Sequence, residues 1–149
     1  ACWGDMRLVY HRLVLEPTEP IQRVALTPKV FALFETTGIR HGLLTLISPH
    51  TTAYVNLNER EEMLQRDMVA FLQGLVPQQG DYLHNRNPVD DRPNAHAHLM
   101  GLFMNASETI PIVDGQLMLG GWQSIFLCEL DGPRAERQVH LQCLGEGGG

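Results

Sequence analysis

The 149-residue sequence lacks the features that mark membrane and secreted proteins. No apolar run approaches the roughly 18 residues that a membrane-spanning helix needs, and the first residues lack the apolar stretch of a signal peptide. The cysteines, Cys2, Cys128 and Cys143, are an odd number without a CxxC pair, which is not the pattern of a disulfide framework or a zinc knuckle. We therefore expect a cytoplasmic chain with reduced thiols and no membrane partner.

Lysine is almost absent. Lys29 is the single lysine among 11 basic residues, and 17 acidic residues give a formal net charge of -6. Nucleic-acid binding needs clustered basic charge that neutralises phosphates, so we expect no nucleic-acid partner. The arginine excess has two explanations that stay open: a GC-rich coding sequence, or a local cluster that binds a small anion through paired guanidinium hydrogen bonds.

The common short catalytic motifs are missing as well. The sequence contains no GxGxxG after a strand, no P-loop, no GxSxG and no HExxH. Cys128 and Cys143 fall within strand-like patterns, which is typical of small core residues rather than of nucleophiles.

The apolar periodicity predicts one α+β domain over residues 1–144 with mostly antiparallel strands, followed by a disordered glycine-rich tail over residues 145–149. Strands and helices alternate without a regular βαβ repeat, and the last third is mostly hairpins, with a turn at Asp114-Gly115. The predicted strands cover residues 6–15, 42–48, 52–57, 109–113, 116–119, 123–130 and 137–144.

Helix signals occur at three places. Thr27 precedes Pro28 as an expected N-cap, and Gly38 follows as the C-cap. Asn58 with Glu61 predicts a capping box for a second helix. Asn94 is the expected cap of the third. The apolar faces expected to point inward are Val30, Phe31 and Phe34 in the first helix, Leu64, Met68, Phe71, Leu72 and Leu75 in the second, and Ala95, Leu99, Leu102 and Phe103 in the third.

Histidines are the main candidates for chemistry. His50, His84, His96 and His98 lie at element ends or beside the polar loop 80–93, where functional groups concentrate. His96 and His98 are two residues apart, so a helix directs them about 200° from each other. We expect His98 to face the site and His96 to be exposed.

Two chemistries remain open for His50, His84 and His98. With a carboxylate from Asp90 or Asp91 they are ligands of a divalent metal, because neutral imidazole suits Zn and mixed nitrogen and oxygen ligands admit other metals. Alternatively they act as general acids and bases, since histidine titrates near neutral pH.

Other polar groups are candidates for binding an anion or a ring. The segment that begins at Ser107 and the pair Arg134 and Arg137 are either anion-binding groups or a polar strand edge and a solvated charge cluster. Trp122 is either a stacking platform for a flat ring or a core residue.

Taken together, several blocks resemble the signature of the YjbQ family, in order and from about residue 6 to residue 144. The blocks are residues 50–53 (HTTA) with 57–59 (LNE), 82–84 (YLH), Asp91 with 93–99 (PNAHAHL), 107–111 (SETIP), 120–123 (GGWQ) and 129–134 (ELDGPR). The resemblance implies a compact α+β sandwich that assembles as a homotrimer.

The same resemblance implies an activity. It is that of a thiamine-phosphate synthase, a transferase that joins a hydroxymethylpyrimidine diphosphate to a thiazole phosphate with loss of pyrophosphate, with a divalent metal such as Zn or Mg near the shared histidines. It implies His50, His84, Asp91 and His98 as the catalytic cluster and the three histidines as the metal ligands. The substrate-binding residues it implies are Trp122, Gln123, Glu129 and Arg134, to which we add Ser107 and Arg137 as the candidate anion-binding groups named above. A non-enzymatic protein that binds a metal or an anionic metabolite, and a metal-dependent phosphate-ester hydrolase, are the alternatives.

Overall fold

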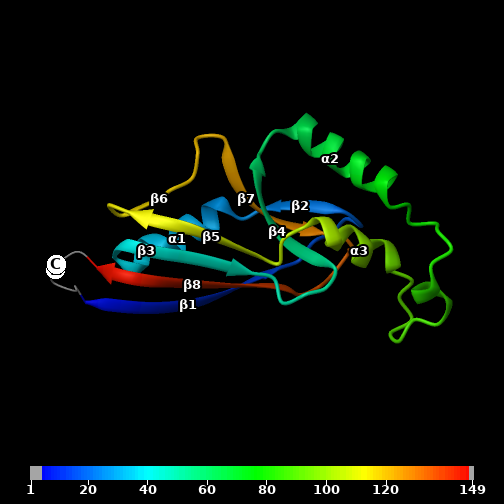
Figure 1. The fold of residues 1–149 in the computed structure, drawn as a ribbon, viewed down its shortest axis with the longest axis horizontal. Coiled ribbons are helices and arrows are strands. Elements are labelled where there is room, and N and C mark those ends of the chain that lie inside the picture. Colours follow the sequence, from blue (N-terminus) through cyan, green and yellow to red (C-terminus); the bar gives the residue numbers. More distant parts are fainter. Residues whose placement is uncertain (1–4, 148–149) are drawn as a thin grey trace.

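The computed structural model describes residues 5–147, which form two β-sheets (Figure 1). The larger sheet has the order β1-β8-β3-β5-β6, with bounds Met6–Leu15, Arg137–Gly147, Ile39–Ile47, Ser107–Val113 and Gln116–Leu117. The smaller sheet has the order β2-β7-β4, with bounds Gln22–Ala25, Gln123–Glu129 and Ala53–Glu59. Neighbouring strands in both sheets run antiparallel, which confirms the predicted α+β class.

Three α-helices accompany the sheets in the described part of the chain: α1 Thr27–Thr37, α2 Glu62–Leu75 and α3 Ala95–Met100. In Figure 1, α2 extends outward beside the smaller sheet, whereas α3 and the loop before it lie at the end of the sheets where β3 leads into β4. Within residues 5–147 no helix is long and apolar enough to cross a membrane.

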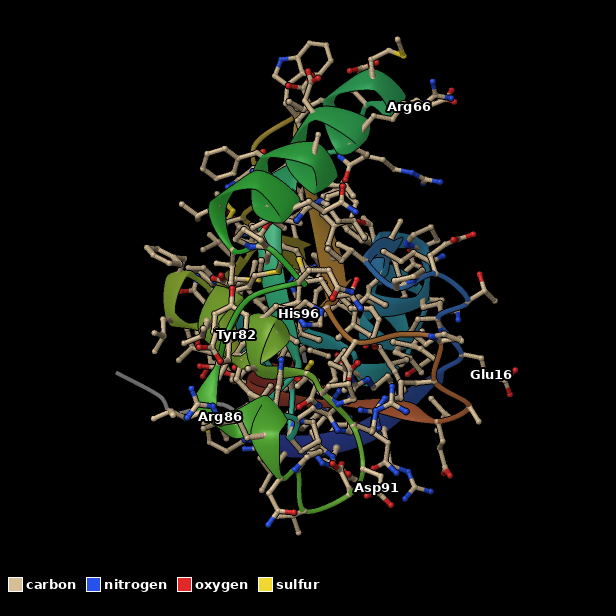
Figure 2. All side chains as sticks on the ribbon, turned by 90° about the vertical axis from the view of Figure 1, so that its right-hand side faces the viewer. Glu16, Arg66, Tyr82, Arg86, Asp91 and His96 are labelled. Carbon is tan, nitrogen blue, oxygen red and sulfur yellow. The ribbon has the colours of Figure 1, made fainter. Side chains whose placement is uncertain are left out.

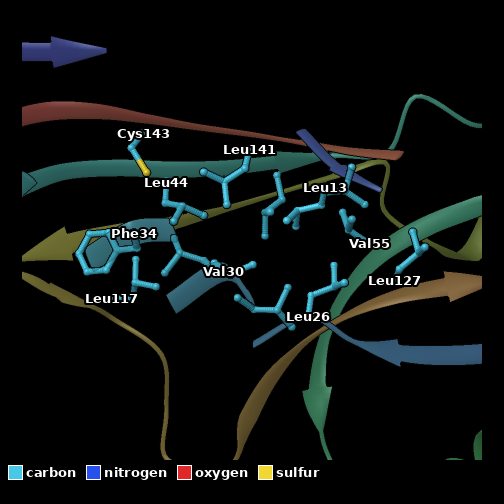
Figure 3. Packing of buried hydrophobic residues seen from close by; sticks show 14 of the residues in the cluster. Leu13, Leu26, Val30, Phe34, Leu44, Val55, Leu117, Leu127, Leu141 and Cys143 are labelled. Atoms are coloured by element: carbon cyan, nitrogen blue, oxygen red, sulfur yellow. The ribbon is translucent and has the colours of Figure 1, made fainter. Parts of the chain in front are cut away.

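The main core lies between the two sheets and is closed by α1 (Figure 3). Alternate residues of the strands point into it, as Leu44 and Leu46 of β3 do. A fully buried leucine-sized side chain contributes about 1.5–3 kcal/mol relative to an exposed one, so this core is the main source of stability. The labelled core residues are Leu13, Leu26, Val30, Phe34, Leu44, Val55, Leu117, Leu127, Leu141 and Cys143.

The predicted caps are partly wrong. Leu26, not Thr27, occupies the N-cap of α1, and the Thr27 hydroxyl instead accepts a hydrogen bond from the Ile125 amide of β7 at 2.8 Å. Gly38 follows α1 at φ 66°, which confirms the predicted left-handed C-cap. The predicted turn also forms, because Asp114 and Gly115 both have positive φ.

The start and the inner face of α2 differ from expectation. Asn58 is still part of β4, and the Glu61 carboxylate caps the helix by accepting from the Met63 and Leu64 amides. Of the predicted apolar face only Leu72 is buried; the others are half-buried or exposed, Phe71 with 65% of its surface in solvent. Helix periodicity shows which residues share a face, but the neighbouring elements decide whether that face is covered.

The sheets contain one strand that was not predicted, β2, and one strand that is longer than predicted, β8. β2 was not predicted, since its residues Gln22 to Ala25 are neither alternating nor fully buried. β8 continues to Gly147 and pairs with β1 and β3, so the tail expected from residue 145 is ordered strand as far as 147. A side chain at Gly145 would meet the His41 carbonyl at 2.2 Å, so close strand packing explains this glycine. Residues 148–149, and Cys2, lie outside the described residues.

Candidate functional site

A cavity of about 410 Å³ opens at the end of the sheets where β3 leads into β4 and β7 leads into β8. Its walls come from the loop after β3, the loop before α3, α3 itself and the segment between β7 and β8. Five residues predicted from the sequence line it together: His50, His84, His98, Arg134 and Arg137. The fold thus unites groups that lie up to 87 positions apart in the chain.

One of these arginines is held by a buried ion pair. The Arg137 Nε and Nη2 atoms donate to the two carboxylate oxygens of Glu129, each at 2.6 Å, and Nη2 also donates to the Thr52 hydroxyl at 2.7 Å. Glu129 is fully buried and its Oε1 also accepts the Asp131 amide. Glu129 was predicted to bind substrate, but burial withdraws it from any ligand. It positions Arg137, whose Nη1 is the part of the guanidinium left to face the cavity.

Asp131 organises the other two arginines near the cavity. Its Oδ2 accepts hydrogen bonds from Arg92 at 3.0 Å, from Asn94 at 2.8 Å and from Arg134 at 2.7 Å. Burial raises the pKa of Asp131, but the hydrogen bonds from these donors outweigh it and lower the pKa to about 2. The carboxylate is therefore ionised throughout the physiological range.

Asp131 was not among the predicted site residues. The signal was present, because residues 129–134 place two carboxylates and an arginine directly after the buried strand β7. In this network three guanidinium groups, of Arg92, Arg134 and Arg137, share the two carboxylates of Glu129 and Asp131. Of the charged groups that line the cavity itself, the guanidinium groups of Arg134 and Arg137 outnumber the single carboxylate of Asp90, and guanidinium donors suit an anionic ligand.

The hydrogen-bond network fixes the protonated nitrogen of His84. The Asn94 amide nitrogen donates to the Asp131 carboxylate, so the Asn94 Oδ1 is the atom that faces His84. His84 must then donate from Nε2, at 3.0 Å, and in its neutral form it keeps a free lone pair on Nδ1. Asn94 occupies the N-cap position of α3, as predicted, but its side chain makes no capping hydrogen bond. The Asn85 Oδ1 accepts the Ala95 amide instead.

His50 has the opposite tautomer. Its Nε2 accepts a hydrogen bond from the Gln138 amide at 2.9 Å, so the neutral ring carries its proton on Nδ1. Burial and, next, the charge of Arg137 lower the pKa of His50 below its usual 6.5. At neutral pH the ring is an uncharged hydrogen-bond donor beside the cavity.

These tautomers bear on the expected metal site. A histidine ligand must present a lone pair, and His50 uses its lone pair on Gln138. Within residues 5–147 no group of three His, Cys, Asp or Glu side chains is arranged to hold a metal ion. The three histidines predicted as Zn or Mg ligands therefore do not fit that role as a set, and the Nδ1 of His84 is the ring nitrogen that the network leaves available.

Two corrections concern α3. His98 lines the cavity, as predicted, and its ring lies edge-on to His84 with a centroid distance of 5.0 Å. His96, predicted to be exposed, is only 5% exposed, and its Nδ1 is buried without a hydrogen-bond partner (Figure 2). Leu102 and Phe103, predicted to point inward, are 78% and 70% exposed. α3 ends at Met100, so the helical spacing used for these two residues does not apply.

The predicted catalytic carboxylate is displaced by one position. Asp91 adopts a φ of 58° and is exposed on the loop before α3 (Figure 2). It is not among the residues that line the cavity, whereas Asp90 is. Of the two aspartates that the sequence offers as metal ligands, Asp90 and not the expected catalytic residue Asp91 is therefore the one at the cavity.

The remaining predicted substrate-binding residues lie elsewhere. Trp122 is 79% exposed, and Gln123 begins β7, whereas Glu129 ends it beside the cavity. Six strand residues span about 20 Å, so within one copy of the protein Trp122 and Gln123 lie far from the cavity. Ser107 pairs with Ile47 and is not part of the cavity wall.

The fold and the cavity define a class: a two-sheet α+β protein whose sheet ends carry a polar, arginine- and histidine-lined cavity. The comparisons with known proteins agree with the fold. The family model "UPF0047 protein YjbQ-like" matches residues 11–146, and the chain belongs to the YjbQ family.

Relatives and solved structures cover almost the whole chain. A UPF0047 protein of Methanothermobacter thermautotrophicus is 37% identical over 145 residues, which are 97% of this chain and 98% of the relative. The crystal structure of a YbjQ-like protein of Sulfolobus solfataricus has a TM-score of 0.89 at 34% identity and covers 95% of this chain and 100% of its own. A hypothetical protein of Aeropyrum pernix has a TM-score of 0.86 at 40% identity, covering 93% and 99%.

Proposed function

We propose that this chain is a transferase of the thiamine-phosphate-synthase type, which joins a hydroxymethylpyrimidine diphosphate to a thiazole phosphate. One observation carries the proposal: the cavity combines Arg134 and Arg137 with histidines whose protonated nitrogens are fixed by the network. Arginine forks bind phosphate oxygens, and a positioned imidazole donates or accepts a proton.

The reaction requires stabilisation of a leaving group. The lone pair of the thiazole nitrogen forms the new C–N bond, and the C–O bond to the diphosphate breaks with both electrons going to pyrophosphate. Arg137 Nη1 and Arg134 face the negative charge that develops on that group, and neutral His50 donates from Nδ1. Such preorganised donors act most strongly where the site excludes water.

A divalent metal is an additional expectation that these residues support only in part. His50 does not fit as a ligand, whereas the free Nδ1 of His84 does. Bound at that side of the cavity, a metal would neutralise diphosphate charge. Elemental analysis of the purified protein tests for one directly.

The activity test mixes purified protein with the two phosphorylated precursors and follows thiamine phosphate by chromatography. We expect turnover that falls strongly in Arg134→Leu and His50→Ala, because Arg134 is a partly exposed lining arginine whose removal leaves Asp131 paired with Arg92. His41→Ala is the matched control, because His41 is an exposed histidine that pairs with Asp114 far from the cavity. No product above that of His50→Ala, with or without added divalent metal, overturns the proposal.

The same preparations separate the alternatives. Binding of inorganic pyrophosphate without any turnover supports a non-enzymatic protein for an anionic metabolite. Release of phosphate from a panel of phosphate esters that a chelator abolishes supports a metal-dependent hydrolase.

We further propose a cytoplasmic homotrimer. The outer face of the larger sheet supports self-association, because Leu8, Leu144, Leu43 and Pro111 form an uncovered row across four strands. The free, buried thiols of Cys128 and Cys143 suit a reducing compartment. Light scattering coupled to size-exclusion chromatography tests the trimer; a monomer at micromolar concentration contradicts it.

A further inference from the structure

A second cavity of about 490 Å³ adjoins the first and differs from it in chemistry. Its walls are mainly apolar, formed by Tyr82, Leu83, Ala95 and Leu99. His84 and His98 line both cavities, so the two imidazoles separate a charged compartment from an apolar one.

We propose that one ligand occupies both cavities, with its phosphate or diphosphate in the arginine compartment and a flat apolar or aromatic group against Tyr82 and Leu99. This inference rests on the proposed function, whose two substrates are both ring-bearing phosphate esters, and adds the place in the fold where the ring of such a ligand lies. The ligand is then a phosphate ester of a small ring-bearing alcohol, and inorganic phosphate alone fills only one compartment.

The apolar compartment is built as a fixed surface. The Tyr82 hydroxyl donates to the Pro77 carbonyl at 2.6 Å, which holds the ring beside the end of α2. Asn85 accepts the Ala95 amide at 3.0 Å, which ties the loop to α3. Because these bonds exist before any ligand binds, a ring that enters the compartment orders few additional side chains, and this favours binding.

The polar groups of the second cavity are few: the side chains of Asp81, His84 and His98 and the Tyr82 hydroxyl, with both histidines on the side shared with the first cavity. Asp81 pairs with Arg86 at 3.1 Å, and both side chains are mostly exposed at its rim. His84 donates to Asn94 on the side of the first cavity. The second cavity therefore selects by shape and apolar area rather than by charge, as the organic part of an ester requires.

The placement also concerns the ring of the proposed substrate. Trp122, for which ring stacking was one of the two alternatives, lies about 20 Å from the anion cavity along β7. Tyr82 lines the second cavity, which shares His84 with the anion cavity. The aromatic platform that serves this site within one chain is Tyr82.

The experiment compares two probes with the same anionic group, methyl phosphate and benzyl phosphate, by titration calorimetry of the full chain. We expect benzyl phosphate to bind at least about tenfold more tightly, since it buries an aromatic ring. Leu83→Ser should lower the affinity for benzyl phosphate about threefold or more and leave methyl phosphate unchanged. Leu83 is 76% exposed, so the variant should fold; Leu102→Ser, at 78% exposure and outside both cavities, is the matched control.

The outcomes distinguish this inference from the proposed function. Equal affinities for the two probes, both lost in Arg134→Ala, overturn the two-compartment ligand but keep the anion site. Benzyl phosphate binding that Arg134→Ala leaves intact overturns the anion site. Tighter benzyl phosphate binding that Leu83→Ser weakens and Arg134→Ala abolishes supports both. Absence of binding by either probe overturns both.

Discussion

Both carboxylate oxygens of Glu129 accept hydrogen bonds from the Arg137 guanidinium at 2.6 Å, and neither residue is more than 4% exposed. Water does not reach this pair, so each buried charge is stabilised only by the other. Removal of one partner would leave the other charge buried and unpaired. The pair lies directly behind the cavity wall, so the geometry of the anion site and the stability of the fold depend on the same contact.

Removal of one partner should destabilise the protein strongly. Glu129→Ala leaves the Arg137 charge buried and unpaired, and we expect it to lower the free energy of unfolding by about 3–5 kcal/mol in urea denaturation. Glu62→Ala, which removes an exposed pair with Arg66, is the control and should cost less than about 1 kcal/mol. Similar losses in the two variants would contradict the buried-pair assignment.

Acid should weaken the Asp131 network. The folded-state pKa of Asp131, about 2, lies below its ordinary value of 3.8, so ionised Asp131 stabilises the folded state above about pH 4, and this is lost as the pH falls through 2. We expect Asp131→Asn to remove roughly 2 kcal/mol at pH 6 and progressively less towards pH 2. Urea denaturation across this range measures the difference, and Asp67→Asn on exposed α2 is the control. A pH-independent loss would show that charge is not the cause.

Protonation of His96 should oppose folding. Burial lowers the pKa of His96 below 6.5, so the unfolded chain takes up its proton first as the pH falls. Stability is complete above the unfolded pKa and declines as the pH falls from about 7 to 5. His96→Leu should flatten this decline in urea denaturation, whereas His41→Leu at an exposed site should not. An unchanged slope in His96→Leu argues against the buried neutral ring.

The tautomer of His50 is directly observable. ¹⁵N-resolved NMR at pH 7 should show the proton on Nδ1, because Nε2 accepts the Gln138 amide. Titration with Zn²⁺ should leave the ring nitrogen shifts of His50 unchanged. A proton on Nε2, or a zinc-dependent shift of His50, would restore the three-histidine metal site.

The two histidines of α3 should behave differently towards ligand. His98→Ala should weaken binding of inorganic pyrophosphate by about tenfold, as loss of one charge-assisted hydrogen bond does. Folded His96→Ala should keep the wild-type affinity, because His96 is not part of the cavity wall. Titration calorimetry measures the pyrophosphate affinity of both variants. Equal losses would contradict the orientation of α3 in which His98, and not His96, faces the cavity.

Much of the fold was predictable from local patterns. Alternation in β1 and β8, the Gly38 cap and the Asp114-Gly115 turn each depend on residues close together in sequence. The wrong predictions share another property. Phe71 and Leu102 are exposed and His96 is buried because of what packs, or does not pack, against them, and helical spacing carries no information about that.

The sequence by itself determined the strands other than β2, the three helices, the family and the short set of histidines and arginines that gather at one end of the sheets. Only the tertiary structure decided the roles within that set. Asp131, rather than Asp91, organises the arginines, Glu129 is buried behind Arg137, and His50 and His84 carry their protons on opposite nitrogens. The physical reason is that periodicity encodes each segment's own conformation, whereas hydrogen-bond partners and burial arise from contacts between segments far apart in the chain.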